Sequence, residues 1–283
     1  MTGQGTYLST NPETSVARLL APNPGLFTGP GTNTYVIVSG DECVVIDPGP
    51  IHDAHRATIR DFIQGLQPRA VLVTHTHSDH APLANPIAAE FGIPSYGYAA
   101  GPGFDPDRRL REGDRLIFGR AVLKVLYTPG HTDDHLCFQL DDTLFTGDHI
   151  MGGSTVVVDD MTSYLRSLHR VREARPARLL PGHGHEIADP GAVISRYVDH
   201  RIAREAQILE SVRFGATTVG EVVESVYSEL DARLYPAAAV SVVAHLKKLN
   251  HEGRLVFDQD SPTVTTNPSM AWNLEVGCST GAG

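Results

Sequence analysis

The sequence predicts an α/β fold for its larger N-terminal part and a second, smaller domain after it. Between residues 33 and 180, short apolar runs typical of strands alternate with stretches that have helical spacing. Most of the unusual polar residues come directly after these apolar runs, where loops carried by a rigid scaffold often hold the functional groups. After residue 190 the pattern changes to helices followed by a short strand pair.

The expected elements of the N-terminal part follow from periodicity and turn residues. Residues 33–47 are expected to form two strands around the turn Ser39-Gly40-Asp41. Further strands are expected at 70–74, at 116–128 with a turn at Gly119, at 135–147 with an Asp141-Asp142 turn, and at 178–180. Helices are expected at 55–66, 83–91 and 161–175, and residues 93–107, rich in Gly, Pro and Tyr, are expected to form a loop.

The C-terminal part has the pattern of a winged-helix-like domain. Helices are expected at 193–214, 219–227 and 237–250, followed by a strand at 255–257. We therefore expect one domain at 1–192 and a second at 193–257. Residues 258–283 are polar and lack periodicity, which predicts a flexible tail.

Composition and charge limit the classes of function. The chain has 283 residues, 41% hydrophobic and 20% charged, which is typical of a soluble globular protein. A formal net charge of −10 disfavours broad electrostatic attraction to nucleic acid. The three cysteines are far apart, so neither a disulfide framework nor a zinc ribbon is expected. The first residues do not resemble a secretory signal and no apolar run approaches membrane-spanning length, so a cytoplasmic location is expected.

The strongest functional signal is the run His75-x-His77-x-Asp79-His80, which directly follows an expected strand. Imidazole and carboxylate groups are ligands for Zn(II), and also for Mn(II) or Fe(II). Three further candidates, His131, Asp148 and His183, each follow a glycine at a strand end. Seven ligands are too many for one tetrahedral zinc. They suit two ions bridged by a carboxylate, about 3.5–4 Å apart as in two-metal hydrolases.

These motifs resemble the metallo-β-lactamase superfamily in both composition and order. They are HTHSDH at 75–80, PGH at 129–131, TGD at 146–148 and PGH at 181–183. The resemblance implies an αβ/βα sandwich with the site at one edge. It also implies ligand roles: His75, His77 and His131 for the first metal, Asp79, His80 and His183 for the second, and Asp148 as the bridge.

Longer stretches resemble the beta-lactamase-like protein 2 subfamily. They are PGTNTY at 30–35, LYTPGHTDDH at 126–135, FTGDHIMGGSTVV at 145–157, LPGHGHEI at 180–187, and the C-terminal segments 199–209 and 244–255. The resemblance covers roughly residues 20–257. It implies a winged-helix-like C-terminal domain. Because that subfamily includes a single-strand-specific endoribonuclease and polyketide thioesterases, it implies two substrate classes.

The expected activity is that of a dinuclear zinc hydrolase. A metal-bound water has its pKa lowered toward about 7, so hydroxide is available to attack phosphorus or a carbonyl carbon. Hydrolysis of a phosphodiester, as by a single-strand endoribonuclease, is one expectation. A thioesterase or acyl hydrolase in the manner of glyoxalase II is the alternative, and the complete ligand set disfavours a third reading, a non-catalytic binding module.

The electrostatics of the C-terminal domain weigh against the nuclease. Residues 193–257 contain eight Lys/Arg and eight Asp/Glu, a poor footprint for RNA. The spacing of Arg196, Arg201 and Arg204 is expected to give a solvated helix face. The expected partners are therefore a small acyl substrate or single-stranded RNA, with no membrane. A homodimer through the amphipathic stretch 240–249 is a further expectation.

Other side chains are candidates for supporting roles. Asp79 or Asp148 is expected to hold the hydroxide, and His135 to protonate the leaving group or bind substrate. His149 and His185 are alternatives to His135 in this role, with a structural role equally open for all three. The remaining candidates are Asp47 and Asp134 as partners of the ligand histidines, Asn33 facing the cleft, the loop 152–155 lining the site, and the loop aromatics Phe27, Tyr96, Tyr98 and Phe104, for most of which packing is favoured.

Overall fold

The computed structural model describes residues 6–11, 14–153 and 155–267. The chain divides into two compact units, 1–201 and 202–283, and each is described by itself. The division falls inside the long helix α4 (Pro190–Arg213), beyond the boundary at 192 that the sequence suggested. Among the described residues, no helix combines the length and the apolar character needed to cross a bilayer.

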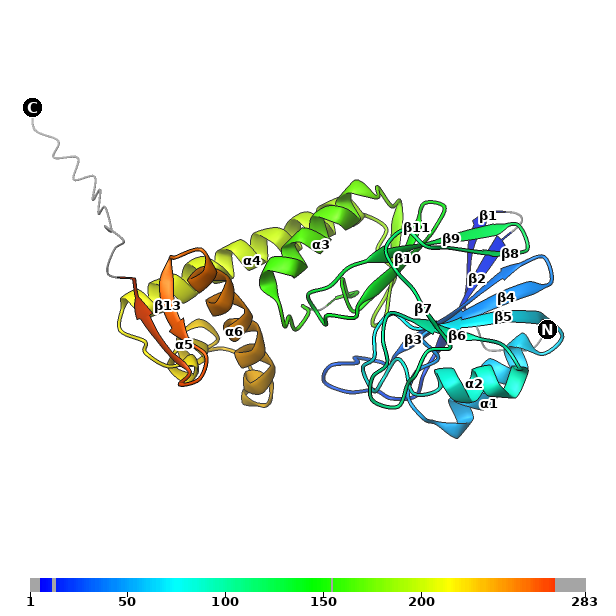
Figure 1. Cartoon of the computed structure of the whole chain (residues 1–283), viewed down its shortest axis with the longest axis horizontal. Coiled ribbons are helices and arrows are strands. Elements are labelled where there is room, and N and C mark those ends of the chain that lie inside the picture. Colours follow the sequence, from blue (N-terminus) through cyan, green and yellow to red (C-terminus); the bar gives the residue numbers. More distant parts are fainter. Residues whose placement is uncertain (1–5, 12–13, 154, 268–283) are drawn as a thin grey trace, which may run out of the picture. The chain divides into compact units, whose positions relative to one another are not determined.

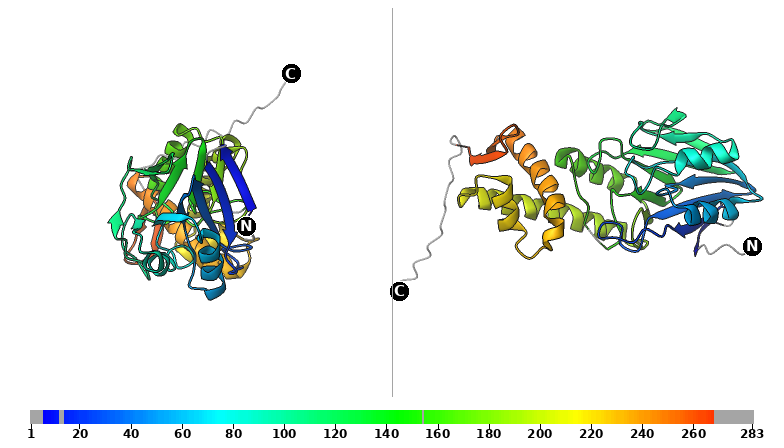
Figure 2. Two further views of the ribbon diagram at one scale, coloured as in Figure 1. Left: turned by 90° about the vertical axis from the view of Figure 1, so that its right-hand side faces the viewer. Right: turned by 90° about the horizontal axis from the view of Figure 1, so that it is seen from below.

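The first unit contains two β-sheets (Figure 1). The seven-stranded sheet has the order β1-β2-β3-β4-β5-β6-β7, made of β1 (Thr6–Asn11), β2 (Thr14–Leu20), β3 (Asn33–Ser39), β4 (Glu42–Ile46), β5 (Gln67–Leu72), β6 (Ser95–Gly97) and β7 (Arg108–Arg109). The five-stranded sheet has the order β12-β11-β10-β9-β8, made of β8 (Arg115–Phe118), β9 (Ala121–Tyr127), β10 (Leu136–Leu140), β11 (Thr143–Gly147) and β12 (Arg178–Pro181). Figure 2 shows both sheets from two further sides.

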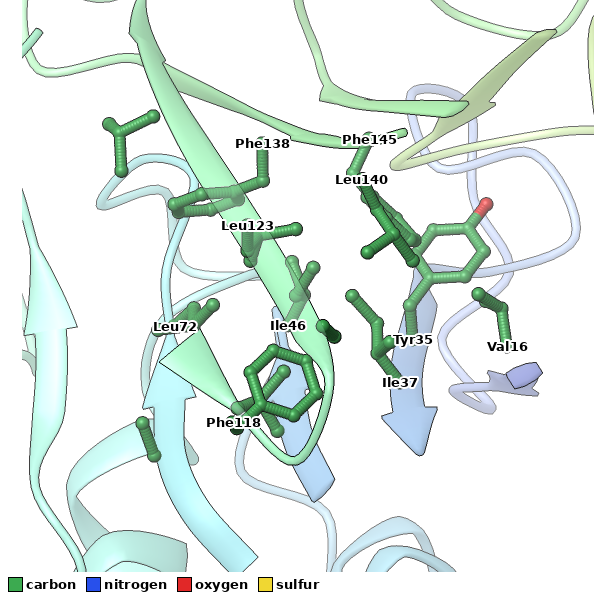
Figure 3. Packing of buried hydrophobic residues seen from close by; sticks show 14 of the residues in the cluster. Val16, Tyr35, Ile37, Ile46, Leu72, Phe118, Leu123, Phe138, Leu140 and Phe145 are labelled. Carbon is green, nitrogen blue, oxygen red and sulfur yellow. The ribbon is translucent and has the colours of Figure 1, made fainter. Parts of the chain in front are cut away.

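The main core lies between the two sheets (Figure 3). Alternate residues of β3, β4 and β5 face those of β9, β10 and β11, because successive side chains of a strand point to opposite faces. The ring of Tyr35 packs edge-on against Phe145 at a centroid distance of 5.2 Å. The labelled members of this cluster are Val16, Tyr35, Ile37, Ile46, Leu72, Phe118, Leu123, Phe138, Leu140 and Phe145.

A second apolar layer covers the outer face of the seven-stranded sheet. Helices α1 (Asp53–Ile63) and α2 (Ala84–Phe91) pack there through Ile59, Ile63 and Ile87.

Helix α3 (Met161–Glu173) is capped at its N-terminus by Asp160, whose carboxylate accepts a hydrogen bond from the backbone N–H of Ser163. The layers of helix and sheet agree with the αβ/βα sandwich expected from the sequence motifs.

The second unit is a small helical domain with a β-hairpin. Its elements are the end of α4, α5 (Val219–Val226), the 3₁₀ turn η1 (Ala232–Leu234), α6 (Tyr235–His251), β13 (Leu255–Asp258) and β14 (Thr263–Thr266). A capping box formed by Thr218 and Glu221 starts α5. Val242, Leu246 and Leu249 of α6 pack with Ile208 of α4 in its core. Three helices and a two-stranded wing confirm the winged-helix-like expectation.

The structure differs from the sequence expectations at three places. β1 and β2 pair antiparallel before residue 33, where no element was expected. The region 93–107 contains the short strand β6. The expected tail from residue 258 is partly wrong, because β14 pairs with β13 and completes the wing. Residues 268–283 of that tail lie outside the described residues.

Candidate metal centre

The run 75–80 leaves the end of β5 and turns back on itself. The carbonyl of His77 accepts hydrogen bonds from the backbone N–H groups of His80 and Ala81, at 3.0 and 3.1 Å. The backbone N–H of Thr76 donates to Asp134 Oδ2 at 2.9 Å. This turn brings the rings of His75 and His77 together.

One group of candidate ligands consists of His75, His77, His131 and Asp148. One ligand atom from each residue lies within 4.8 Å of the others. His77 Nδ1 is 2.9 Å from His75 Nε2 and 3.1 Å from His131 Nε2. His77 is exposed, whereas the other three residues are buried. The group is therefore open to solvent on the side of His77.

A second group consists of Asp79, His80 and His183, with the same limit of 4.8 Å. The Nε2 atoms of His80 and His183 are 3.1 Å apart, and Asp79 Oδ2 is 3.1 Å from His183 Nε2. His80 and His183 are buried, while a quarter of the Asp79 side chain is exposed. Asp79 is therefore the ligand of this group that faces solvent.

Asp148 lies between the two groups. Its Oδ1 is 3.4 Å from Nε2 of both His80 and His183, and its Oδ2 is 3.8 Å from Nε2 of His131. Oδ1 is buried and makes no hydrogen bond to the described residues. A buried carboxylate oxygen without a partner is costly, and a cation on either side would remove that cost.

The seven side chains fit metal ions better than they fit one another. Nitrogen atoms converge on His77 Nδ1 from two rings, and a single proton can satisfy only one of these contacts. A cation accepts all of the lone pairs, and the metal–nitrogen distance of about 2.0–2.1 Å in tetrahedral sites places neighbouring nitrogens about 3.3 Å apart. The observed separations are close to that value.

The charges of the two groups differ in a way that suits cation binding. Burial lowers the pKa of His75, and enclosure of part of the His77 side chain together with the neighbouring His131 lowers that of His77, so both rings are neutral and able to act as ligands. At His80 the charges of Asp148 and Asp47 outweigh burial and raise the pKa. At His183 burial alone would lower the pKa, but contacts with Asp148 and Asp79 raise it to about 9. A metal ion would replace these protons as the counter-charge of the carboxylates.

In four of the five candidate ligand histidines, His75, His80, His131 and His183, the second ring nitrogen contacts a hydrogen-bond acceptor or a hydroxyl group. His80 Nδ1 donates to Asp47 Oδ2 at 2.9 Å, which bears out Asp47 as an outer partner. His131 Nδ1 donates to the carbonyl of Val157 at 2.7 Å, and His183 Nδ1 to that of Gly31 at 3.2 Å. The carbonyl partners were not predicted, because backbone acceptors carry no side-chain signal in a sequence.

Two expected roles are corrected by their contacts. Asp134 does not support a ligand histidine; its carboxylate accepts from the backbone of Thr76 and fixes the turn. Asn33 is buried and donates to the carbonyls of Pro181 and Gly184, at 2.9 and 3.0 Å, so it holds the segment carrying His183.

The three additional histidine candidates occupy different environments. His135 is buried, its Nδ1 lies 3.0 Å from Thr128 Oγ1, and its Nε2 accepts from the backbone N–H of Asp148 at 3.2 Å. His149 is also buried and burial lowers its pKa to about 3. His185 is exposed beside the loop that follows Asp148. Among the three, only His185 is open to solvent.

The remaining expected lining residues are distributed between surface and core. Phe27 is exposed, Phe104 is buried, and Tyr96 and Tyr98 pack partly buried against the main core. Met151, Gly153 and Thr155 line a cavity together with His185, whereas Ser154 lies outside the described residues.

Glycines allow backbone to approach the ligands closely. A Cβ on Gly182 would lie 2.7 Å from both Asp148 Oδ1 and His80 Cε1. Gly147 adopts φ +47°, and a Cβ there would lie 2.6 Å from Thr74 Oγ1. The glycines that directly precede Asp148 and His183 are therefore required, because the site leaves no space for a Cβ at either position.

Comparisons with known proteins agree with this geometry. Residues 27–183 match the metallo-beta-lactamase superfamily and residues 218–263 match the beta-lactamase associated winged helix domain. The beta-lactamase-like protein 2 homolog of Drosophila melanogaster is 35% identical over 269 residues, which are 85% of this chain and 89% of the relative. The atrochrysone carboxyl ACP thioesterase of Aspergillus chevalieri is 35% identical over 229 residues, 75% of this chain and 73% of the relative.

Solved structures share the fold at lower identity. A metallo-beta-lactamase family protein from Thermus thermophilus covers 91% of this chain at 20% identity with a TM-score of 0.75, and the match spans 100% of that structure. A beta-lactamase domain protein from Burkholderia ambifaria covers 92% at 21% identity with a TM-score of 0.77, and 93% of that structure is matched. The motifs, the paired ligand groups and these matches together show that the chain belongs to the metallo-beta-lactamase superfamily, as a metal-dependent hydrolase with the associated winged helix domain.

Proposed function

We propose that this hydrolase holds two zinc ions and cleaves acyl thioesters. The observation that carries the proposal is the complete, two-group ligand set in a chain 35% identical to a carboxyl ACP thioesterase over 75% of its length. A thioesterase from Emericella nidulans is 33% identical over 198 residues, 68% of this chain. A net charge of −10 is no obstacle to a small acyl substrate.

The side chains of the centre divide the work of hydrolysis. His75, His77 and His131 would hold one ion, Asp79, His80 and His183 the other, and Asp148 would bridge them. Bound zinc lowers the pKa of water toward about 7 and stabilises negative charge on the substrate oxygen.

Asp79 is placed to handle the proton of the attacking water. Although burial would raise its pKa, contact with His183 lowers it, so the carboxylate is ionised at neutral pH and can accept a hydrogen bond. The oxygen of water bonds to the carbonyl carbon, the C–S bond breaks, and the thiol leaves with a proton. The products are a carboxylic acid and a thiol.

The contacts of His135 favour a positioning role. Because Nε2 accepts from the backbone N–H of Asp148, its proton is on Nδ1, which faces Thr128. Its expected role as the proton donor to the leaving group remains a prediction, and His185 is the solvent-exposed alternative.

The test is whether zinc-loaded protein hydrolyses butyryl-N-acetylcysteamine. The rate of hydrolysis is measured from the thiol that is released. Asp79→Asn should lower kcat by about 100-fold or more, because it removes both a ligand of the second ion and the carboxylate beside the attacking water. Asp105→Asn, at an exposed position, should leave kcat unchanged. If no thioester in a series from short to long acyl chains releases thiol, the proposal is contradicted.

Phosphodiester hydrolysis, as by a single-strand endoribonuclease, is the second candidate, favoured by the winged helix domain at 218–263. Three cations of this domain are already paired with carboxylates, which weighs against it: Lys248 and Arg254 pair with Glu205, and Arg233 pairs with Asp231. Incubating the same zinc-loaded protein with a single-stranded RNA oligonucleotide decides between thioester and phosphodiester hydrolysis. RNA cleavage that is lost in Asp79→Asn, without thioester turnover, would replace the first proposal by the second.

A further inference from the structure

The first unit contains a cavity of about 400 Å³ outside the two ligand groups. It lies between the segment that follows Asp148 and the first half of α4. Its polar lining includes His185, Arg196, Tyr197 and Arg201, and Met151 and Ile187 contribute apolar surface. None of the residues that line it is acidic. The cavity therefore has a cationic character in a chain that is acidic as a whole.

Arg201 is the most unusual residue of this cavity. The expectation of a solvated face for Arg201 is wrong, because only 2% of the residue is exposed. Its Nη2 donates to the carbonyl of Val156 and its guanidinium lies 5.3 Å from the centre of the Tyr164 ring. Its Nε is buried without a hydrogen-bond partner among the described residues. No described carboxylate forms an ion pair with it.

A buried guanidinium without a carboxylate is unfavourable unless an anion reaches it. Arginine stays charged at all ordinary pH values, so it cannot relieve burial by losing its proton. A buried charge without an oppositely charged partner destabilises a protein. Arg196 supplies a second cation on the same helix, and it also lacks a described ion pair. Both arginines line the same cavity, which therefore offers two positive charges to an oxyanion.

The cavity adjoins the candidate metal centre through short backbone links. The consecutive carbonyls of Val156 and Val157 accept hydrogen bonds from Arg201 and from His131. The backbone N–H of Gly152 also donates to the carbonyl of His183 at 3.0 Å. The segment after Asp148 thus lines the cavity through Met151 and Thr155 and contacts a ligand histidine through Val157.

We propose that this cavity binds an anionic group of the substrate, a carboxylate or a phosphate, while the thioester lies at the metal centre. The proposal rests on the proposed thioester hydrolysis. Arg196 and Arg201 hold the oxyanion through charge-assisted hydrogen bonds. The apolar wall formed by Met151 and Ile187 accommodates the neighbouring part of the substrate. The cavity therefore selects thioesters that carry a negative charge over neutral ones of equal size.

Binding of thioether analogues tests the proposal without any reaction. The zinc-loaded protein is titrated calorimetrically with S-butyl-N-acetylcysteamine, S-(3-carboxypropyl)-N-acetylcysteamine and S-butyl-coenzyme A. The first is neutral, the second carries a carboxylate on the acyl side, and the third carries phosphates on the carrier side. We expect one charged analogue to bind about tenfold or more tightly than the neutral one, the gain of one charge-assisted hydrogen bond. The charged analogue that binds more tightly shows whether the anion lies on the acyl side or on the carrier side of the substrate.

Arg196→Gln should remove this preference and leave binding of the neutral analogue unchanged. Arg166→Gln, an exposed arginine of α3, is the matched control and should retain the preference. Arg201→Gln should have the same effect as Arg196→Gln, and its circular dichroism spectrum and Tm show whether it is folded. The exposed position of Arg196 keeps the test valid if Arg201→Gln does not fold.

Two outcomes overturn the proposal. If all three analogues bind with equal affinity, or if none of them binds, the cavity does not select an anion. A single-stranded RNA oligonucleotide that binds in an Arg196-dependent way, when no analogue does, assigns the cavity to nucleic-acid phosphate instead. Failure of the proposed function has a different signature, because charged analogues would then bind with Arg196 dependence while no thioester is hydrolysed.

Discussion

Nδ1 of His80 lies 2.9 Å from Oδ2 of Asp47, and both side chains are buried. Asp47 also accepts hydrogen bonds from Thr74, through the backbone N–H at 2.8 Å and the hydroxyl at 2.7 Å. One carboxylate thus joins the end of β4 to the start of the ligand run and orients a ligand ring. Asp47 itself has φ 48°, a conformation that a carboxylate side chain can support through local hydrogen bonds.

The first prediction concerns this carboxylate. Asp47→Asn removes the negative charge that holds the His80 ring, so the second metal should bind about 10- to 100-fold more weakly. Competition with a chromophoric chelator measures the affinity. Asp105→Asn, which changes an exposed carboxylate, is the matched control and should retain wild-type affinity. Unchanged affinity in Asp47→Asn would show that Thr74 and the backbone alone orient His80.

The second prediction separates the two carboxylate ligands. Asp148 lies between both groups, whereas Asp79 contacts only the second. Asp79→Asn should therefore retain about one metal per chain, and Asp148→Asn should retain less than about one, against about two in the wild type. Elemental analysis after dialysis measures the content. Equal retention by the two variants would contradict a bridging position for Asp148.

The third prediction uses the close approach of backbone at Gly182. An added Cβ would lie 2.7 Å from Asp148 Oδ1 and His80 Cε1, so Gly182→Ala forces the ligands apart. Overpacking of this kind costs about 1–3 kcal/mol, equivalent to a loss of about 5- to 150-fold in metal affinity if the strain is relieved by release of the metal.

Gly191→Ala is the control for this change. The nearest atom to its added Cβ is Asp189 Oδ1 at 3.7 Å, an ordinary contact distance, and metal affinity should be unchanged. If Gly182→Ala binds metal as tightly as Gly191→Ala does, then the ligands have more freedom than these distances indicate.

The residues of the two candidate ligand groups could be picked out from the sequence because their signal is local. Histidines and aspartates follow strand ends within short motifs, and each motif can be recognised without knowing its neighbours. Partners distant in sequence carry no such signal. Asp47 precedes Pro-Gly, an ordinary turn, and its contact with His80 spans 33 residues. The carbonyl of Val157, which holds His131, could not be found at all from side-chain identities.

Arg201 shows the limit of helical periodicity. Its spacing from Arg196 and Arg204 is typical of a solvated face, and the pattern alone contains nothing that covers it. The segment carrying Val156 lies over this face and buries the guanidinium, a tertiary contact between residues 45 apart. β14 was missed for a related reason, because a short polar strand is defined by its partner rather than by apolar alternation.

The last prediction concerns the stability of the second unit at low pH. The Glu205 carboxylate pairs with Lys248 at 2.7 Å and with Arg254, and only 12% of its side chain is exposed. Burial would raise the pKa of Glu205, but His245 and Lys248 lower it to about 2. The folded pKa is thus below the ordinary value of about 4.5. The stabilisation is therefore complete above about pH 5 and is lost as pH falls toward 2.

Glu205→Gln removes the more buried of the two carboxylates that pair with Lys248 and Arg254, and leaves them with only the more exposed Glu252. The free energy of unfolding of the second unit should fall by about 3 kcal/mol at pH 7. Denaturation followed by amide NMR signals of α6 measures that unit alone. The difference from wild type should shrink below pH 5, because protonation of Glu205 has the same effect as the substitution. Glu224→Gln, at an exposed position of α5, should match the wild type at every pH. A difference that stays constant down to pH 2 would mean that Glu205 contributes through its shape and not through its charge.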